Sequence, residues 1–107
     1  MENKSAFLEF VGDTPFTRLL NFLLIGREFD YTLTDMANKA GISWTTLNRI
    51  FPHMLARGIV VEVRQIGRAR LYKLNTANPV VKKMVELHNS VLLEQSKRAE
   101  KEMLVEA

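Results

Sequence analysis

The stretch LTDMANKAGISWTTLNRIFPHMLARGIV, residues 33–60, decides how this chain folds. Thr32 precedes it as a helix-capping residue, with Thr34 as a second possible cap. Gly41 suits the left-handed backbone that ends many helices. Ser43 then caps a second helix after a very short connection. Two helices joined in this way by a glycine-containing turn form the helix-turn-helix pattern. The apolar residues of the first helix share one face: Leu33, Met36, Ala37 and Ala40.

The helix that begins at Trp44 contains a proline. Because its apolar residues recur at helical spacing, we expect Trp44 to join them at the edge of the core and Pro52 to face solvent. Helices bend convex toward solvent, so a proline is best tolerated there. We therefore expect one bent helix, with a break at residue 51 as the alternative. The apolar face consists of Leu47, Ile50, Phe51, Met54 and Leu55, and the polar face of Thr45, Asn48, Arg49, Pro52 and Ala56.

A further helix precedes this pair. Thr14 is a good cap and Pro15 suits the first helical position, while Gly26 marks the end. Residues 5–11 are short and mixed, so helix and strand both stay open for them.

A hairpin and a long helix follow the pair. Residues 59–65 and 69–75 are rich in β-branched and aromatic residues, and Gly67 between them is suited to a tight turn. Asn78 and Pro79 then start a helix that we expect to run to near residue 104.

These elements predict a mainly α fold with a small β-hairpin, a winged helix-turn-helix plus a long C-terminal helix. We expect the winged helix-turn-helix domain in residues 1–76 and a dimerisation helix in residues 77–107. Residues 33–60 and the hairpin RQIGRARLYKLN resemble small prokaryotic regulators of the ArsR and MarR type, especially compact archaeal members that end in a long helix. The resemblance covers about residues 14–75 and implies a DNA-binding transcriptional regulator. The chain has no cysteine, so the thiolate metal sensing of some ArsR members is not implied.

The positive charge of the chain is concentrated in one segment. The net charge is +3, yet residues 43–73 hold six Lys or Arg against one acid, Glu62. Residues 1–42 hold four against six, and residues 74–107 hold five against five. A basic segment that coincides with the second helix of the pair and the hairpin favours a polyanionic partner, although a solvated surface is the alternative.

Double-stranded DNA fits this segment, with the helix in the major groove and the hairpin on the adjacent backbone or minor groove. Arg suits guanine, Asn suits adenine and the Thr methyl group suits thymine, while a helix N-terminus can donate to phosphate. Ordinary surface positions are the alternatives for Thr45, Thr46, Asn48 and His53. Support of the turn is a further alternative for Thr46, and a solvated hairpin tip is the alternative for Arg68 and Arg70. The candidate DNA-binding residues are Ser43, Thr45, Thr46, Asn48, Arg49, His53, Arg64, Arg68 and Arg70.

The last helix offers an interface for a homodimer. Val80, Met84, Leu87 and Val91 are spaced four, three and four apart, as in a short heptad seam. Packing of this seam on its own domain is the alternative.

Other classes of function are disfavoured. His53 and His88 are the two histidines, and no paired acids or phosphate-binding glycine loop mark a catalytic or metal site. We therefore expect no enzyme activity, no cofactor and no metal. No stretch approaches the ~20 apolar residues of a membrane span, and the N-terminus lacks the pattern of a signal peptide, so we expect a cytoplasmic protein without a membrane partner.

Two rival functions stay open. Winged helices also act as protein-interaction modules, and a dimer with a helical stalk could coat chromatin without sequence preference. Neither a small-molecule effector nor an operator sequence is identified by the residues.

Overall fold

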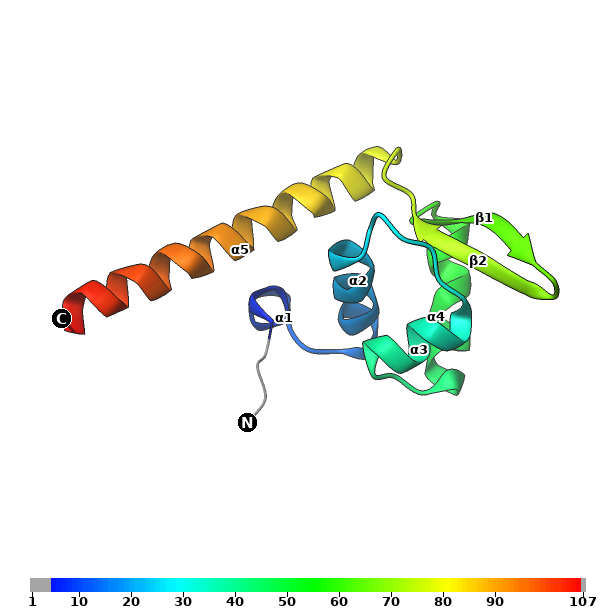
Figure 1. Ribbon diagram of the computed structural model, residues 1–107, viewed down its shortest axis with the longest axis horizontal. Coiled ribbons are helices and arrows are strands. Elements are labelled where there is room, and N and C mark those ends of the chain that lie inside the picture. Colours follow the sequence, from blue (N-terminus) through cyan, green and yellow to red (C-terminus); the bar gives the residue numbers. More distant parts are fainter. Residues whose placement is uncertain (1–4, 107) are drawn as a thin grey trace.

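The computed structural model describes residues 5–106, and the side chains of residues 5–104. The shorter helices and a hairpin gather in one body, and a long helix extends away from it (Figure 1). The elements are α1 (Ala6–Val11), α2 (Pro15–Ile25), α3 (Leu33–Ala40), α4 (Trp44–Ala56), β1 (Val60–Ile66), β2 (Ala69–Leu74) and α5 (Pro79–Glu106). The predicted fold class is thereby confirmed.

The predicted caps set the helix boundaries. The hydroxyl groups of Thr14, Thr32 and Ser43 each accept a hydrogen bond from the backbone N–H three residues later. These bonds satisfy donors that have no partner within the helix. Gly41 ends α3 with φ 70°, the left-handed conformation that glycine adopts without steric cost. The turn between α3 and α4 therefore follows directly from local sequence.

The undecided segment at the N-terminus is helix α1. Ser5 caps it by accepting from the Leu8 N–H, and Phe7 is buried against the rest of the molecule. A helix of six residues is too short to be stable alone, so its packing on α2 and α5 maintains it.

The core lies where α2, α3 and α4 meet the hairpin and the first part of α5. Apolar faces of all these elements contribute buried side chains to one cluster. Leu47, Phe51 and Met54 anchor α4 in it, as predicted, whereas Leu55 is exposed. The helix is continuous through Pro52, which is exposed, so the prediction of one unbroken helix is confirmed.

The hairpin is held against α4 and against the segment before α3. β1 and β2 pair antiparallel, with a bulge between Glu62 and Arg64. Tyr31 and Tyr72 exchange two backbone hydrogen bonds of 2.8 Å, which adds residue 31 to the sheet beside β2. The rings of Phe51 and Tyr72 meet edge to face, with centroids 4.8 Å apart. These contacts fix where the hairpin projects relative to α4.

Side chains also join the end of α4 to the start of α5. The Asn75 side chain donates to the Gly58 carbonyl at 3.0 Å, and the Asn78 side chain donates to the carbonyls of Gly58 and Arg57 at 3.0 and 3.2 Å. Asn78 also caps α5 as predicted, because its side-chain oxygen accepts from the Val80 N–H at 2.8 Å. We call these bonds the asparagine junction.

The face of α5 that packs on the domain differs from the predicted seam. Val91 is 7% exposed and belongs to the chain's own interior, and Met84 packs partly against the core. Val80 and Leu87 are 62% and 40% exposed, while Val81, next to Val80, is fully buried. The predicted alternative, packing on its own domain, therefore holds for Met84 and Val91. Val81 and His88 lie seven residues apart and face the core together, so Val80 and Leu87 lie on the outer side of α5.

His88 is the polar centre of this packing. It is 2% exposed, its Nε2 lies 3.1 Å from the Asn21 side-chain oxygen, and its ring lies 5.0 Å from that of Phe7. The Nδ1 atom has no hydrogen-bond partner in the described part of the chain. Burial, together with the nearby charge of Arg27, holds the pKa of His88 below its usual value. His88 therefore joins α5 to α1 and α2 as a neutral group.

The second half of α5 extends beyond the domain. The molecule measures 56 × 31 × 21 Å, and its radius of gyration of 15.7 Å exceeds the roughly 13 Å of a compact chain of this length. Residues 92–104 of α5 are exposed. No described helix combines the length and the apolar character that crossing a bilayer requires.

Candidate nucleic-acid interface

The exposed face of α4 presents the predicted polar side chains. Thr45, Asn48, Arg49 and His53 are exposed, and Pro52 lies among them. The Asn48 amide donates to the Trp44 carbonyl at 2.8 Å, which leaves its carbonyl oxygen for another donor. These residues lie on one continuous helix of 13 residues, about 20 Å long.

Ser43 and Thr46 lie at the N-terminal end of α4 and support its structure. The Ser43 hydroxyl accepts from the Thr46 N–H at 3.1 Å, and the two hydroxyl groups are 2.9 Å apart. Thr46 is half-buried. Both side chains therefore have a capping role in the chain itself, which agrees with the alternative weighed for Thr46.

The three arginines of the hairpin have different surroundings. Arg64 makes two hydrogen bonds to Asp30, at 2.7 and 3.2 Å. This bonding to Arg64 lowers the pKa of the Asp30 carboxyl group. Arg70 is 3.8 Å from Glu62, a distance typical of a weak surface ion pair, and Arg68 is exposed beside the turn. Arg64 thus fixes the hairpin to the segment before α3, while Arg68 and Arg70 project more freely.

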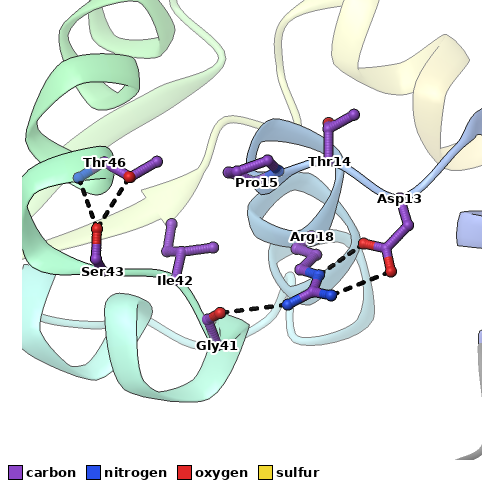
Figure 2. A pocket seen from close by; sticks show the side chains of 8 residues that line it. All are labelled: Asp13, Thr14, Pro15, Arg18, Gly41, Ile42, Ser43 and Thr46. Atoms are coloured by element: carbon purple, nitrogen blue, oxygen red, sulfur yellow. Dashed lines mark hydrogen bonds and ion pairs between the residues drawn. The ribbon is translucent and has the colours of Figure 1, made fainter.

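A hollow of about 340 Å³ lies between the start of α2 and the turn that leads into α4 (Figure 2). Arg18 of α2 reaches across it, with two hydrogen bonds to Asp13, at 2.6 and 3.2 Å, and one to the Gly41 carbonyl at 3.4 Å. These bonds connect the start of α2 to the turn of the helix-turn-helix. The hollow is lined by Asp13, Thr14, Pro15, Arg18, Gly41, Ile42, Ser43 and Thr46.

A second hollow lies between the hairpin and the starts of α3 and α4. Trp44, at the start of α4, borders it together with Arg68 and Arg70 of the hairpin. Trp44 is 53% exposed, so the prediction that it joins the core edge is wrong. Phe51, seven residues later on the same side of α4, packs against Tyr72. The Trp44 indole lies at the edge of the second hollow instead.

Part of this surface could not be predicted from the sequence. Arg18 and Gly41 are 23 residues apart, and their contact depends on how α2 packs against the turn. Asp30 and Arg64 are 34 residues apart, and their pairing depends on the bridge at Tyr31. Contacts of this kind follow from tertiary packing, which helical or strand periodicity does not encode.

Comparison with known proteins identifies the fold. No protein-family model matches the chain, and no curated protein matches it. Among solved structures, a mutant of Lactococcus lactis ZitR in apo form matches with TM-score 0.65 and 20% identity over 81% of this chain and 68% of that chain. HlyU of Vibrio vulnificus, a transcriptional regulator, matches with TM-score 0.57 and 20% identity over 80% and 83%.

A MarR family transcriptional regulator from Silicibacter pomeroyi matches with TM-score 0.53 and 24% identity over 92% of this chain and 65% of that chain. The fold is therefore the winged helix-turn-helix that these solved structures share, as the resemblance of residues 14–75 implied.

Proposed function

We propose that this chain is a transcriptional regulator that binds double-stranded DNA. In this proposal the exposed face of α4 enters the major groove, and the hairpin meets the adjacent backbone or minor groove. The observation that supports it most is the position of the basic segment, because Arg49 of α4 and Arg68 and Arg70 of the hairpin are all exposed. The solved structures with this fold include transcriptional regulators, which supports the same function.

The side chains of α4 divide into two proposed roles. Arg49 and Asn48 have the donor and acceptor patterns that read guanine and adenine, and the Thr45 methyl group can contact thymine. Ser43, Thr46 and His53 lie nearer the edges of α4 and are proposed to contact the phosphate backbone. Among the hairpin residues, Arg68 and Arg70 are proposed to contact DNA directly, while Arg64 would do so from a position fixed by Asp30.

We also propose that the chain acts as a homodimer. One recognition helix offers few base contacts, so two chains on two half-sites would supply useful specificity. Val80 and Leu87 of the predicted seam support this interface, because both are exposed on α5. Met84 and Val91 would contribute mainly by holding α5 on its own domain.

Charge reversal tests the DNA interface. Fluorescence anisotropy of a labelled genomic duplex should show binding by the parent protein and a loss of at least 100-fold in affinity for Arg49→Glu/Arg68→Glu, an estimate that assumes roughly 1.5 kcal/mol or more per contact. Lys97→Glu/Lys101→Glu is the matched control, since it changes the net charge equally on the far part of α5. Equal affinity of the Arg49→Glu/Arg68→Glu variant and the parent would refute the proposed interface.

The salt dependence and a set of duplexes separate the rival functions. If each chain of a dimer neutralises about four phosphates, log K should fall with log salt at a slope of about −7. A protein-interaction module would show no such DNA binding. A chromatin-coating protein would bind every duplex with similar affinity, whereas a sequence-specific regulator would prefer particular fragments.

A further inference from the structure

The second hollow, between the hairpin and the starts of α3 and α4, combines two arginines with an exposed tryptophan, and this composition indicates a ligand. It is lined by Thr32, Leu33, Thr34, Trp44, Arg68, Ala69, Arg70 and Tyr72. We propose that this hollow seats one sugar–phosphate strand of the duplex, with the Trp44 indole packed on a deoxyribose and Arg68 and Arg70 on the flanking phosphates. The inference rests on the proposed function. It adds Trp44 as a residue that contacts DNA without reading a base.

The geometry of duplex DNA supplies the first argument. A single sugar–phosphate strand separates the major groove from each neighbouring minor groove. If α4 lies in one groove and the hairpin reaches the next, the strand between those grooves must cross the surface between α4 and the hairpin. The second hollow borders this place, because its lining includes Trp44 at the start of α4, Arg68 in the hairpin turn and Arg70 on β2.

The charges of the lining supply the second argument. Arg68 and Arg70 are exposed cations, and no lining residue of this hollow is acidic. Glu62, 3.8 Å from Arg70, is too distant and too exposed to hold that guanidinium firmly. A phosphodiester would therefore meet two available arginines, which suit phosphate recognition through their planar donor groups.

The exposed indole supplies the third argument. Trp44 is a large aromatic side chain that is 53% exposed, so a partner that covers it gains hydrophobic free energy. Trp44 also borders a neighbouring hollow lined by Thr34, Ala37, Asn38, Ile42 and Ser43, so the indole stands as a ridge with open space on two sides. A deoxyribose is the apolar part of the strand, and the indole is the one large apolar side chain of this lining that is exposed.

The single tryptophan of the chain makes the inference directly measurable. Binding of a genomic duplex is measured by anisotropy of a label on the DNA, and the tryptophan emission is recorded in the same titration. We expect the emission to change at the same DNA concentrations as the anisotropy. Bound DNA should also lower the quenching of Trp44 by acrylamide at least two-fold.

Substitutions complete the test. We expect Trp44→Ala to weaken binding about ten-fold on every duplex alike, and Trp44→Phe to weaken it much less. Phe10→Ala, which removes an exposed aromatic side chain from α1, is the matched control and should bind like the parent. Circular dichroism verifies that each variant is folded, and the emission measurement on the parent needs no substitution.

The outcomes separate the two proposals. If anisotropy shows binding while the emission, the quenching and the Trp44→Ala affinity all stay unchanged, the strand does not occupy this hollow, and the proposed regulator function stands. If anisotropy shows no binding to any duplex at low salt, the proposed function itself fails, and the inference fails with it.

Discussion

His88 links the pH of the solution to the packing of α5. It is a buried neutral group whose pKa lies below the ordinary value of about 6.5, owing to burial and to the charge of Arg27. The unfolded chain therefore binds a proton at higher pH than the folded chain. The contribution of neutral His88 to the free energy of unfolding is fully present above about pH 6.5. It is lost as the pH falls through the lower pKa that His88 has in the folded state.

We expect the free energy of unfolding, measured by urea denaturation, to decrease from pH 7.5 to pH 5. His88→Gln keeps a neutral hydrogen-bonding group near Asn21 and should make this decrease smaller. His53→Gln, at an exposed position on α4, is the control and should leave the decrease unchanged. A decrease of equal size in parent and His88→Gln would show that other groups govern the pH dependence.

Single residues also show where sequence reasoning succeeds and where it fails. Thr14, Thr32 and Ser43 were predicted as caps because a cap depends on the next three residues. Trp44 was misplaced because helical periodicity defines the direction of a side chain and not the size of the space it meets. The hydrogen bonds of Arg64 to Asp30 depend on residues that are distant in the chain, and no local pattern encodes them.

At the scale of elements, α4 keeps its helical form across a proline. The ring of Pro52 faces solvent, and its missing N–H leaves the Asn48 carbonyl without the usual bond within the helix. Since proline in a helix interior costs about 3 kcal/mol relative to alanine, and alanine makes the unfolded chain more flexible, Pro52→Ala should stabilise the protein by about 1–2 kcal/mol.

Urea denaturation at pH 7.5 measures this effect of Pro52→Ala. Pro52→Gly is the informative comparison, because it restores the N–H but has a helix propensity about 1 kcal/mol poorer than alanine. It should therefore stabilise less than Pro52→Ala. Unchanged or reduced stability of Pro52→Ala would mean that the ring makes contacts whose loss outweighs the recovered hydrogen bond.

The elements differ in how far the sequence defines them. α2, α3, α4, the hairpin and α5 each carry their own start and stop residues, and each appeared within a few residues of its predicted range. α1 could not be assigned, because a helix of six residues depends on the surfaces that Phe7 meets on distant elements. The face of α5 was ambiguous for a similar reason, since both Val80 and Val81 fit a seam and tertiary packing selects Val81.

At the scale of the whole molecule, the projecting part of α5 and the exposed side chains at its start favour a second chain as partner. Leu87→Glu should convert a dimer to a monomer, because it places a charge in an apolar interface. Asn89→Glu, an exposed position two residues later, is the matched control and should keep the mass of the parent. Light scattering measures the mass, and an unchanged mass for Leu87→Glu would contradict the proposed dimer interface.

The asparagine junction has a mechanical consequence for such an assembly. The Asn78 side chain, which caps α5, donates to the carbonyl groups of Arg57 and Gly58 just after α4. The Asn75 side chain, which lies before α5, also donates to Gly58, so hydrogen bonds link the two helix ends in addition to the intervening peptide chain. A partner that binds the exposed half of α5 and turns this helix would therefore also move the end of α4, because these hydrogen bonds connect the two. A change in the direction of α5 would thus change the orientation of α4, the helix that we place against the base edges.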